Sequence, residues 1–414
     1  MTRPGSEVRP DPEAGPSGSA RTVLIIVFVT ILIDFVGFSV LVPVLPLYAE
    51  RLGAAPHQVG LILAFYALAQ LIFLPAWGWV SDRIGRRPVL LVSLFGTAVS
   101  FALLARADTI PMIYLARILG GFFAASIGTA QAVVTDVTSS EERAGGMGTI
   151  GAAFGVGMIL GPVLGGSLAT LHPKAPFYAV AALASLNLVV AWVKLPETRG
   201  PNASPPRWRE LAISLIPIPI RVLGAVHERR TVLFLYLFFH LFTAFAVVEA
   251  LVTLYLALSF GATELEVAMV FAWIGVVLVF TQGYLVRRLV VQSGEPRLVM
   301  IGVTAMGAGL VGVSLAPSMP WFYAVGTVIA LGNGLAFPTF TSLYSRACEG
   351  EQSGELLAES QSMATAGRIV GPYAAGLAME WWSPGTPFWM AGVMMFAAVG
   401  VFWAARRSLL AGPP

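Results

Sequence analysis

Long apolar runs recur from one end of this 414-residue chain to the other, and they constrain its fold more than any other feature. Each run is about 20 residues long, the length that a helix rising 1.5 Å per residue needs to cross a hydrocarbon layer about 30 Å thick. Lipid offers the backbone no hydrogen-bond partners, so such runs must be helical there. The composition agrees, because 57% of the residues are apolar and 11% are charged. The chain is therefore predicted to be an all-α integral membrane protein with the lipid bilayer as its partner.

Twelve apolar runs, separated by charged residues or by proline and glycine, are predicted to be transmembrane helices. They are expected at residues 22–48, 58–80, 88–106, 111–135, 144–170, 175–195, 231–258, 265–287, 297–316, 320–345, 356–380 and 386–405. A shorter apolar stretch, 211–226, holds Pro217 and Pro219, which interrupt helical hydrogen bonding, and we interpret it as an interfacial segment. The first apolar run is too long for the core of a signal peptide.

Basic residues lie mostly on one side of this topology. With the N-terminus inside, the inner loops receive most of the arginines, including Arg83, Arg86, Arg87, Arg287 and Arg288. The outer side receives only Arg51, Arg106 and Lys174. Cytoplasmic loops of membrane proteins collect Lys and Arg, so this asymmetry favours twelve spans in the inner or plasma membrane with both termini cytoplasmic. It also accounts for the net charge of +3 without a nucleic-acid site.

The chain looks duplicated. LGPVLGG at 160–166 has a counterpart in VGPYAAG at 370–376, and GWVSDR at 78–83 has one in GYLVRR at 283–288, so the landmarks recur about 210 residues apart. Two pseudo-symmetric six-helix bundles are typical of secondary transporters. The predicted domains are a disordered cytoplasmic tail at 1–20, an N-terminal bundle at 21–195, a cytoplasmic linker at 196–230, a C-terminal bundle at 231–407 and a cytoplasmic tail at 408–414.

Three ionisable residues are predicted to lie at similar depth near the bilayer midplane: Asp34, Arg117 and Arg368. Their positions along the helices put each roughly 18–20 Å from the inner end. Charged groups are costly at that depth, so each is a functional candidate. Asp34 is expected either to bind and release a coupling proton, or to pair with a cationic substrate. The alternative is a fixed structural ion pair or a hydrogen-bonded helix contact.

Arg117 begins a stripe of small and polar residues along one helix face, which continues through Gly121, Ala124, Gly128, Gln131 and Thr135. Such a face either lines a cavity or packs closely against a neighbouring helix. We expect packing at the glycines and cavity exposure at Arg117 and Gln131.

The span at 231–258 holds His240 and Glu249, whose separation of nine residues puts them on opposite faces of a helix. Glu249 is a candidate for proton coupling or for cationic substrates, whereas His240 either faces the cavity or hydrogen-bonds between helices. Arg368 is a candidate for holding an anionic group, balancing Glu249, or satisfying carbonyls freed near Pro372. Asn333 is a hydrogen-bonding candidate. The aromatic candidates for the cavity wall are Phe65, Tyr66, Phe154 and Tyr255.

The span at 144–170 is rich in glycine. Its candidates for a hinge at the interface between the halves are Gly155, Gly157, Gly161, Pro162, Gly165 and Gly166. Small residues allow close helix approach, and proline removes one helical hydrogen bond, so we expect this helix to bend.

The stretch GWVSDRIGRRPVLL, 78–91, resembles the signature loop between helices two and three of the major facilitator superfamily. The matching positions are Gly78, Asp82, Arg83, Gly85, Arg86 and Arg87. YLARILGGFFAAS resembles the fourth-helix motif, and GVGMILGPVLGG the fifth-helix antiporter motif. IDFVGFSVLVPVLP resembles the first helix of the twelve-span drug:proton antiporters, including tetracycline efflux proteins.

The resemblance implies the major facilitator fold and a cytoplasmic latch. Asp82 would meet the positive N-terminal end of helix eleven in the other half, and Arg83 or Arg86 would pair with Asp136. Arg287 stands where the second half would need a counterpart of Asp82, so this role does not carry over there. The implied function is proton-coupled efflux of small amphipathic, drug-like compounds by rocker-switch alternating access, carried out by a monomer.

The alternative is a carrier of another solute, such as a lysolipid, sugar or organic anion. If Arg117 and Arg368 face the cavity, they would favour an anionic headgroup. An enzyme or a channel belongs to a different class. The sequence holds no HExxH motif, metal-spaced Cys/His cluster or Walker loop, so we expect neither catalytic residues nor a metal. No cofactor is expected, and the expected coupling ion is H⁺. The single Cys348 excludes an internal disulfide.

Overall fold

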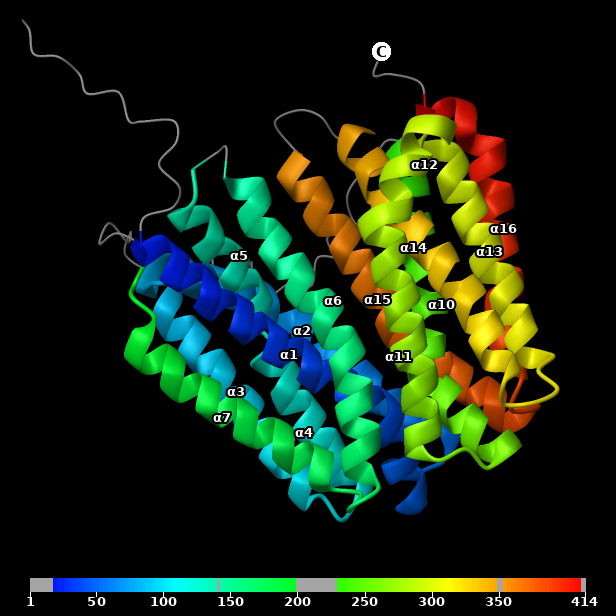
Figure 1. Cartoon of the computed structure of the whole chain (residues 1–414). Helices are drawn as coiled ribbons and strands as arrows, with labels where there is room; N and C mark the ends of the chain where they lie inside the picture. Colours follow the sequence, from blue (N-terminus) through cyan, green and yellow to red (C-terminus); the bar gives the residue numbers. More distant parts are fainter. Residues whose placement is uncertain (1–17, 140–141, 199–228, 348–352, 411–414) are drawn as a thin grey trace, which may run out of the picture.

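The computed structural model describes residues 18–139, 142–198, 229–347 and 353–410, and they form two groups of helices that lie side by side (Figure 1). The first group comprises α1 (Gly18–Arg51), α2 (Pro56–Ile84), α3 (Arg86–Arg106), α4 (Ile110–Phe122), α5 (Ser126–Val137), α6 (Arg143–Ala169) and α7 (Ala175–Lys194). The second comprises α10 (Arg229–Phe260), α11 (Glu264–Phe280), the π-helical η1 (Thr281–Leu285), α12 (Val286–Ser293), α13 (Glu295–Ser314), α14 (Trp321–Ala347), α15 (Ser353–Trp381) and α16 (Thr386–Leu410).

The helices confirm an all-α membrane fold. Within the described residues, 11 helical stretches are long and apolar enough to cross a membrane, and they correspond to all the predicted spans except 356–380. That span is α15, a continuous helix of 29 residues. Polar residues such as Gln361, Arg368 and Glu380 lower its hydropathy, which is why length and composition alone do not single it out.

Two predicted spans are not single regular helices. The span expected at 111–135 breaks between α4 and α5. Ser93 on α3 supports the break, because its hydroxyl donates to the Phe123 carbonyl at 2.5 Å and accepts from the Ala125 N–H at 3.2 Å. The span expected at 265–287 contains η1, where one extra residue widens the helical turn between α11 and α12.

Several predicted boundaries shift. The chain is already helical at Gly18, inside the tail expected at 1–20, and α16 continues to Leu410, beyond the bundle boundary expected at 407. The interfacial segment predicted at 211–226 and most of the predicted tail at 1–20 lie outside the described residues.

The turns between α2 and α3 and between α12 and α13 support the duplication. Gly85 and Gly294, which are 209 residues apart, both have positive φ, +107° and +74°, a region that favours glycine. Beside Gly85, Arg86 pairs with Asp136 at the end of α5, at 3.1 Å. Beside Gly294, Glu295 pairs with Arg346 near the end of α14, at 3.3 Å. The second half thus repeats this ion pair with its charges exchanged.

The two groups meet at the end of the molecule opposite to the start of α1 and the end of α16, the lower end in Figure 1. Here Gly60 lies against the Pro372 carbonyl, and Gly376 against the backbone of His57, so the absence of side chains lets α2 and α15 touch. Two ion pairs also join the groups, Arg51 with Glu264 and His57 with Glu380. We call this the closed end, and the opposite one the terminal end.

The outside of the molecule is apolar along its helices. On α7, for example, Leu186, Val189, Trp192 and Val193 all expose more than half of their surface. Such a continuous apolar exterior suits contact with lipid.

Candidate functional site

A cavity of about 570 Å³ lies between the two groups of helices. This volume falls within the range of roughly 300–1,000 Å³ that is usual for small-molecule sites. Three of its glutamines lie toward the terminal end, where Gln131 and Gln361 are exposed and Gln282 is partly buried. Because contacts between the groups shut the opposite end, the cavity is open at the terminal end.

Aromatic rings form much of the cavity wall. They come from both groups and comprise Phe35, Phe38, Tyr66, Phe101, Phe154, Phe242, Phe245 and Phe337. Phe35 on α1 and Phe154 on α6 meet edge to face with ring centroids 4.7 Å apart, a favourable geometry for aromatic pairs. The wall therefore offers flat apolar surfaces to a ligand.

The second group contributes a pair of opposite charges. Glu249 on α10 and Arg368 on α15 both line the cavity, and their side chains are 3.7 Å apart. Glu249 is 6% exposed, so its charge is balanced mainly by Arg368. The Arg368 guanidinium also lies 5.4 Å from the ring of Phe38 on α1, which brings it into contact with the other group.

The first group contributes two charges that are not paired. Asp34 on α1 lines the cavity, where neither of its buried carboxylate oxygens has a hydrogen-bond partner of good geometry among the described residues, although the Ser126 hydroxyl on α5 lies close enough to interact with the carboxylate. Arg117 on α4 is 4% exposed, lies 4.2 Å above the ring of Tyr66, and has a buried Nε without a partner in the same part of the chain. No ion pair joins Asp34 to Arg117 within the described residues.

Tyr66 lies among all four charges. Asp34, Arg117, Glu249 and Arg368 are each close enough to act electrostatically on its phenol. This residue on α2 therefore connects the charges of the first group with the pair contributed by the second.

Three residues predicted for the cavity lie elsewhere. The Nδ1 of His240 lies 2.8 Å from the Tyr236 carbonyl, one turn earlier in α10, so its polar ring is satisfied locally. Phe65 packs edge to face on Tyr114. Tyr255 donates a hydrogen bond to the Val313 carbonyl at 3.2 Å. Phe65 and Tyr255 thus contact neighbouring helices, whereas His240 contacts residues of its own helix.

The other predicted cavity residues do line it, including Gln131, Phe154 and Asn333. On the predicted stripe, Arg117, Ala124 and Gln131 line the cavity, whereas Gly121 packs against the carbonyl of Tyr66. The Thr135 hydroxyl is turned to the Gln131 carbonyl, to which it donates at 2.9 Å. Gly128 departs from the expected packing, because it is exposed and a Cβ there would meet only Leu74, at 3.9 Å. The helix is also broken in the middle of the stripe.

The glycines of α6 face two different neighbours. Gly157, Gly161 and Gly165 lie against α1 of the same group, whereas Gly155 and Gly166 lie against α11 of the other. α6 is one continuous helix through Pro162. Only part of the predicted hinge therefore lies at the interface between the groups.

The predicted latch loop holds a compact set of contacts within the first group. Arg86 joins Asp82, at 2.7 Å, to Asp136, at 3.1 Å. Of the two arginines proposed to pair with Asp136, the structure selects Arg86, since Arg83 lies 4.0 Å from the ring of Trp79 instead. Arg87 donates to the Trp192 carbonyl at 2.6 Å, and Gly78 has open space beside it. The proposed contact of Asp82 with side chains at the start of α15 lies outside the described residues.

Glu197, which follows α7, contacts this loop, and the sequence did not reveal its role. Its carboxylate accepts hydrogen bonds from the backbone N–H groups of Arg86, at 2.9 Å, and Arg87, at 3.2 Å, and so caps the start of α3. A carboxylate is favourable there because of the helix dipole. The signal available in the sequence is that α3 follows glycine and lacks a Ser, Thr, Asp or Asn cap of its own. Six polar cavity residues were also missed: Gln70, Thr97, Ser100, Ser126, Gln282 and Gln361.

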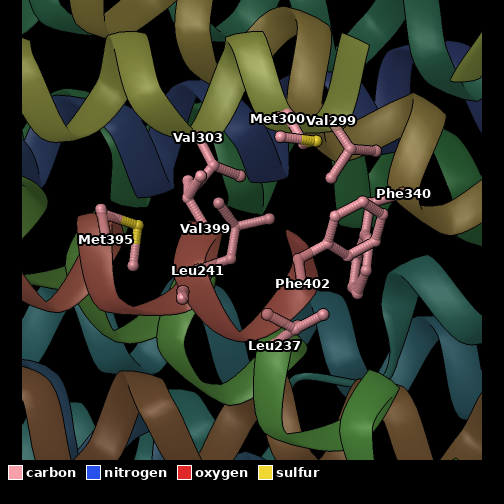
Figure 2. Close-up of a pocket in the computed structure, with 10 residues that line it drawn as sticks. Leu237, Leu241, Val299, Met300, Val303, Phe340, Met395, Val399 and Phe402 are labelled. Atoms are coloured by element: carbon pink, nitrogen blue, oxygen red, sulfur yellow. The ribbon is translucent and has the colours of Figure 1, made fainter. Parts of the chain in front are cut away.

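A second, much smaller cavity lies inside the second group (Figure 2). It measures about 20 Å³ and is enclosed by apolar side chains, including Val303, Met395 and Phe402. It offers no polar anchor for a solute, so the central cavity is the candidate site.

Comparison with known proteins agrees with this architecture. The sequence profile of the Major Facilitator Superfamily matches residues 27–346 and 288–411 of this chain. The class E tetracycline resistance protein of Escherichia coli is 31% identical over 370 residues, which cover 88% of this chain and 90% of that protein. Multidrug resistance protein 2 of Bacillus subtilis is 28% identical, with 94% and 96% covered.

A solved structure shows the same fold at low sequence identity. It is a bacterial homologue of the human lysosomal transporter Spinster in an inward-facing, occupied conformation, and it superposes with a TM-score of 0.76 at 13% identity. The match covers 97% of this chain and 100% of that one.

Proposed function

The chain belongs to the Major Facilitator Superfamily, and from this membership we propose that it is a proton-coupled exporter of small amphipathic, drug-like compounds. It is a multi-pass membrane transporter and not an enzyme. The names of its relatives, which are tetracycline and multidrug resistance proteins, support efflux as the direction of transport.

The proposal of proton coupling rests on the burial of the Asp34 carboxylate. Its two carboxylate oxygens are buried beside the central cavity, no described cation pairs with them, and the polar group beside them is the uncharged Ser126 hydroxyl. A buried carboxylate without a partner is stable when it holds a proton, whereas its charged form needs water or a cation beside it. A site that water reaches from one side at a time therefore makes Asp34 exchange protons with alternating sides.

Alternating access is supported by the contacts between the groups. The cavity is open at the terminal end, while ion pairs and glycine contacts join the groups at the closed end. We propose that the terminal end faces the cytoplasm, because the arginine-rich loops around Arg86 and Arg288 lie there. Rocking of the two groups about the cavity would then open the closed end to the outside.

The test is transport into proteoliposomes under an imposed pH gradient, with tetracycline and fluorescent amphipathic dyes as substrates. The wild type is expected to accumulate substrate when the gradient is present and to stop when an ionophore collapses it. Asp34→Asn, which removes the titratable group, is expected to lower gradient-driven accumulation to the level of protein-free vesicles. Transport by Asp34→Asn with unchanged dependence on the gradient would refute proton coupling through this residue.

Asp108→Asn is the matched control. Asp108 lies in the connection between α3 and α4, pairs with Lys174 at 2.5 Å, and is far more exposed than Asp34. The same chemical change outside the cavity is expected to leave the gradient dependence unaltered.

A carrier of another solute, such as an organic anion, sugar or lysolipid, is the alternative. The observation that favours it is Arg117, whose guanidinium in the cavity pairs with no carboxylate of the described residues. Accumulation of a purely anionic solute, with no transport of amphipathic dyes, would support this alternative. In either case we propose that the chain works as a monomer, in the inner or plasma membrane, with H⁺ in place of a bound cofactor.

A further inference from the structure

We propose that the central cavity is built for zwitterionic amphipaths, with the cationic group of the substrate at Asp34 and its anionic group at Arg117. This inference rests on the proposed transport function, since it assigns a substrate class to the same cavity. It goes beyond that function by fixing which charges the substrate carries.

The first step is the distribution of paired and unpaired charges. Four charged side chains line the cavity, and Glu249 and Arg368 neutralise one another at 3.7 Å. Asp34 and Arg117 remain, one of each sign. Both have buried polar atoms without a partner among the described residues.

The second step is the energetic consequence. An isolated charge in a low-dielectric site costs several kcal/mol unless a partner of opposite sign or water compensates it. Tyr66 meets Arg117 through its ring face, which attracts a cation, while the buried Nε of Arg117 has no hydrogen-bond partner among the described residues. The guanidinium therefore keeps its donors for a carboxylate or phosphate group, which it binds well because of its planar, forked shape.

The third step is that a ligand of a single charge binds less well than a zwitterion. A cation held at Asp34 leaves Arg117 unpaired and adds a like charge to the cavity. An anion held at Arg117 leaves Asp34 unpaired and adds a second negative charge to the cavity. A substrate with both charges satisfies both residues, and the rings of Phe35 and Phe154, which lie on α1 and α6 of the same group, provide an apolar wall for its body. Protonation of Asp34 would then displace the cationic group, which links substrate release to the proton.

The experiment compares rhodamine B with its ethyl ester and with sulforhodamine B in equilibrium binding to the purified full-length protein at neutral pH. The first dye is a zwitterion with a free carboxylate, the second is the same chromophore as a permanent cation, and the third carries two sulfonates on the cationic chromophore and is a net anion. A charge-assisted hydrogen bond contributes about 1.5–3 kcal/mol, so the free acid is expected to bind about ten- to a hundredfold more tightly than the ester. Sulforhodamine B is expected to bind more weakly than rhodamine B.

Variants of Arg117 and Asp34 test which residue binds which charged group of the dye. Arg117→Gln is expected to bring rhodamine B down to the affinity of the ester while the ester binds at least as well as before. Arg117→Lys, which keeps the charge, is expected to retain a smaller preference for the free acid. Asp34→Asn is expected to weaken both dyes by the same factor. Retained ester binding shows that a variant is folded, and the wild-type comparison of the three dyes needs no variant.

Four results would overturn the inference: equal affinity of the wild type for rhodamine B and its ester, preference for the ester, preference for sulforhodamine B, or binding of none of them. Because binding is measured without a pH gradient, it does not depend on proton coupling. Selective binding of rhodamine B with no gradient-driven transport would refute only the proposed coupling, whereas gradient-driven transport of the ester alone would refute only the zwitterion preference.

Discussion

Gly85 shows how a single residue of the signature loop is fixed by its surroundings. Its φ of +107° is strained for any residue with a side chain, and a Cβ at this position would collide with the carboxylate of Glu197. That carboxylate caps α3 through the N–H groups of Arg86 and Arg87. Glycine is therefore required twice, once by the backbone and once by the cap.

Gly53 allows these two requirements to be separated. It also has a positive φ, +85°, but nothing lies within 4 Å of its would-be Cβ. Gly53→Ala is expected to cost about 1 kcal/mol of stability from strain alone. Gly85→Ala is expected to cost roughly 1–2 kcal/mol more, because it also displaces the cap. Thermal unfolding in detergent measures both. In a Glu197→Ala background the two glycine substitutions should become equal, and a difference that persists would show that the cap is not the cause.

At the scale of elements, α6 packs through two faces, one against its own group of helices and one against the other group. Gly161 faces α1, where a Cβ would lie 2.8 Å from the Val36 carbonyl, whereas Gly166 faces α11, where a Cβ would lie 2.9 Å from the Glu264 carbonyl. The first contact lies within one group of helices, and the second lies between the groups. The same substitution should therefore have different effects at the two positions.

Gly161→Ala is expected to lower thermal stability by about 1–3 kcal/mol, as overpacking does in a close-packed interior. Gly166→Ala is expected to shift the protein toward a form in which the closed end opens. Distances between spin labels on Thr109→Cys and Ser318→Cys, in a Cys348→Ser background, report that opening, because both exposed residues lie in connections at the closed end. Gly148→Ala, with open space beside it on the same helix, is the control. Equal opening by Gly161→Ala and Gly166→Ala would contradict this division.

At the scale of the whole molecule, the ion pairs of the closed end bias the balance between conformations. Arg51 with Glu264 and His57 with Glu380 each join the two groups, and all four side chains keep some exposure to water. Exposed pairs contribute about 0–1 kcal/mol each. They therefore adjust the balance between states without locking one of them.

Glu264→Gln is expected to raise the population of molecules open at the closed end by about fivefold at most, the effect of roughly 1 kcal/mol. The spin-label distances at residues 109 and 318 measure it as a growing long-distance component. Exchanging the partners, Arg51→Glu with Glu264→Arg, should restore the original distribution because the pair forms again. If the exchanged pair opens the closed end as far as the single substitution does, attraction between the two side chains is not what holds it shut.

The sequence by itself determined the features that are local along the chain. Apolar runs about as long as a bilayer is thick define spans wherever the chain meets lipid. The hydropathy of α15 is lower because Gln361 and Arg368 line the cavity and Glu380 pairs with His57 at the closed end. The sequence alone likewise shows the arginine asymmetry, the repeat near 210 residues and the signature loop. Depth along a helix follows from the rise per residue, which is why Asp34, Arg117 and Arg368 were expected at one level and line one cavity.

Only the tertiary structure decided which of these charges are paired. Arg368 could have met Asp34 as well as Glu249, and Arg117 could have met a carboxylate instead of the ring of Tyr66. The faces of His240, Phe65 and Tyr255, the break between α4 and α5, and the cap from Glu197 were equally undetermined. Pairing in a membrane protein depends on how helices distant in sequence rotate and approach one another. That geometry is set by close packing of small residues between helices. The pattern along one helix does not show which neighbouring helix these residues will meet.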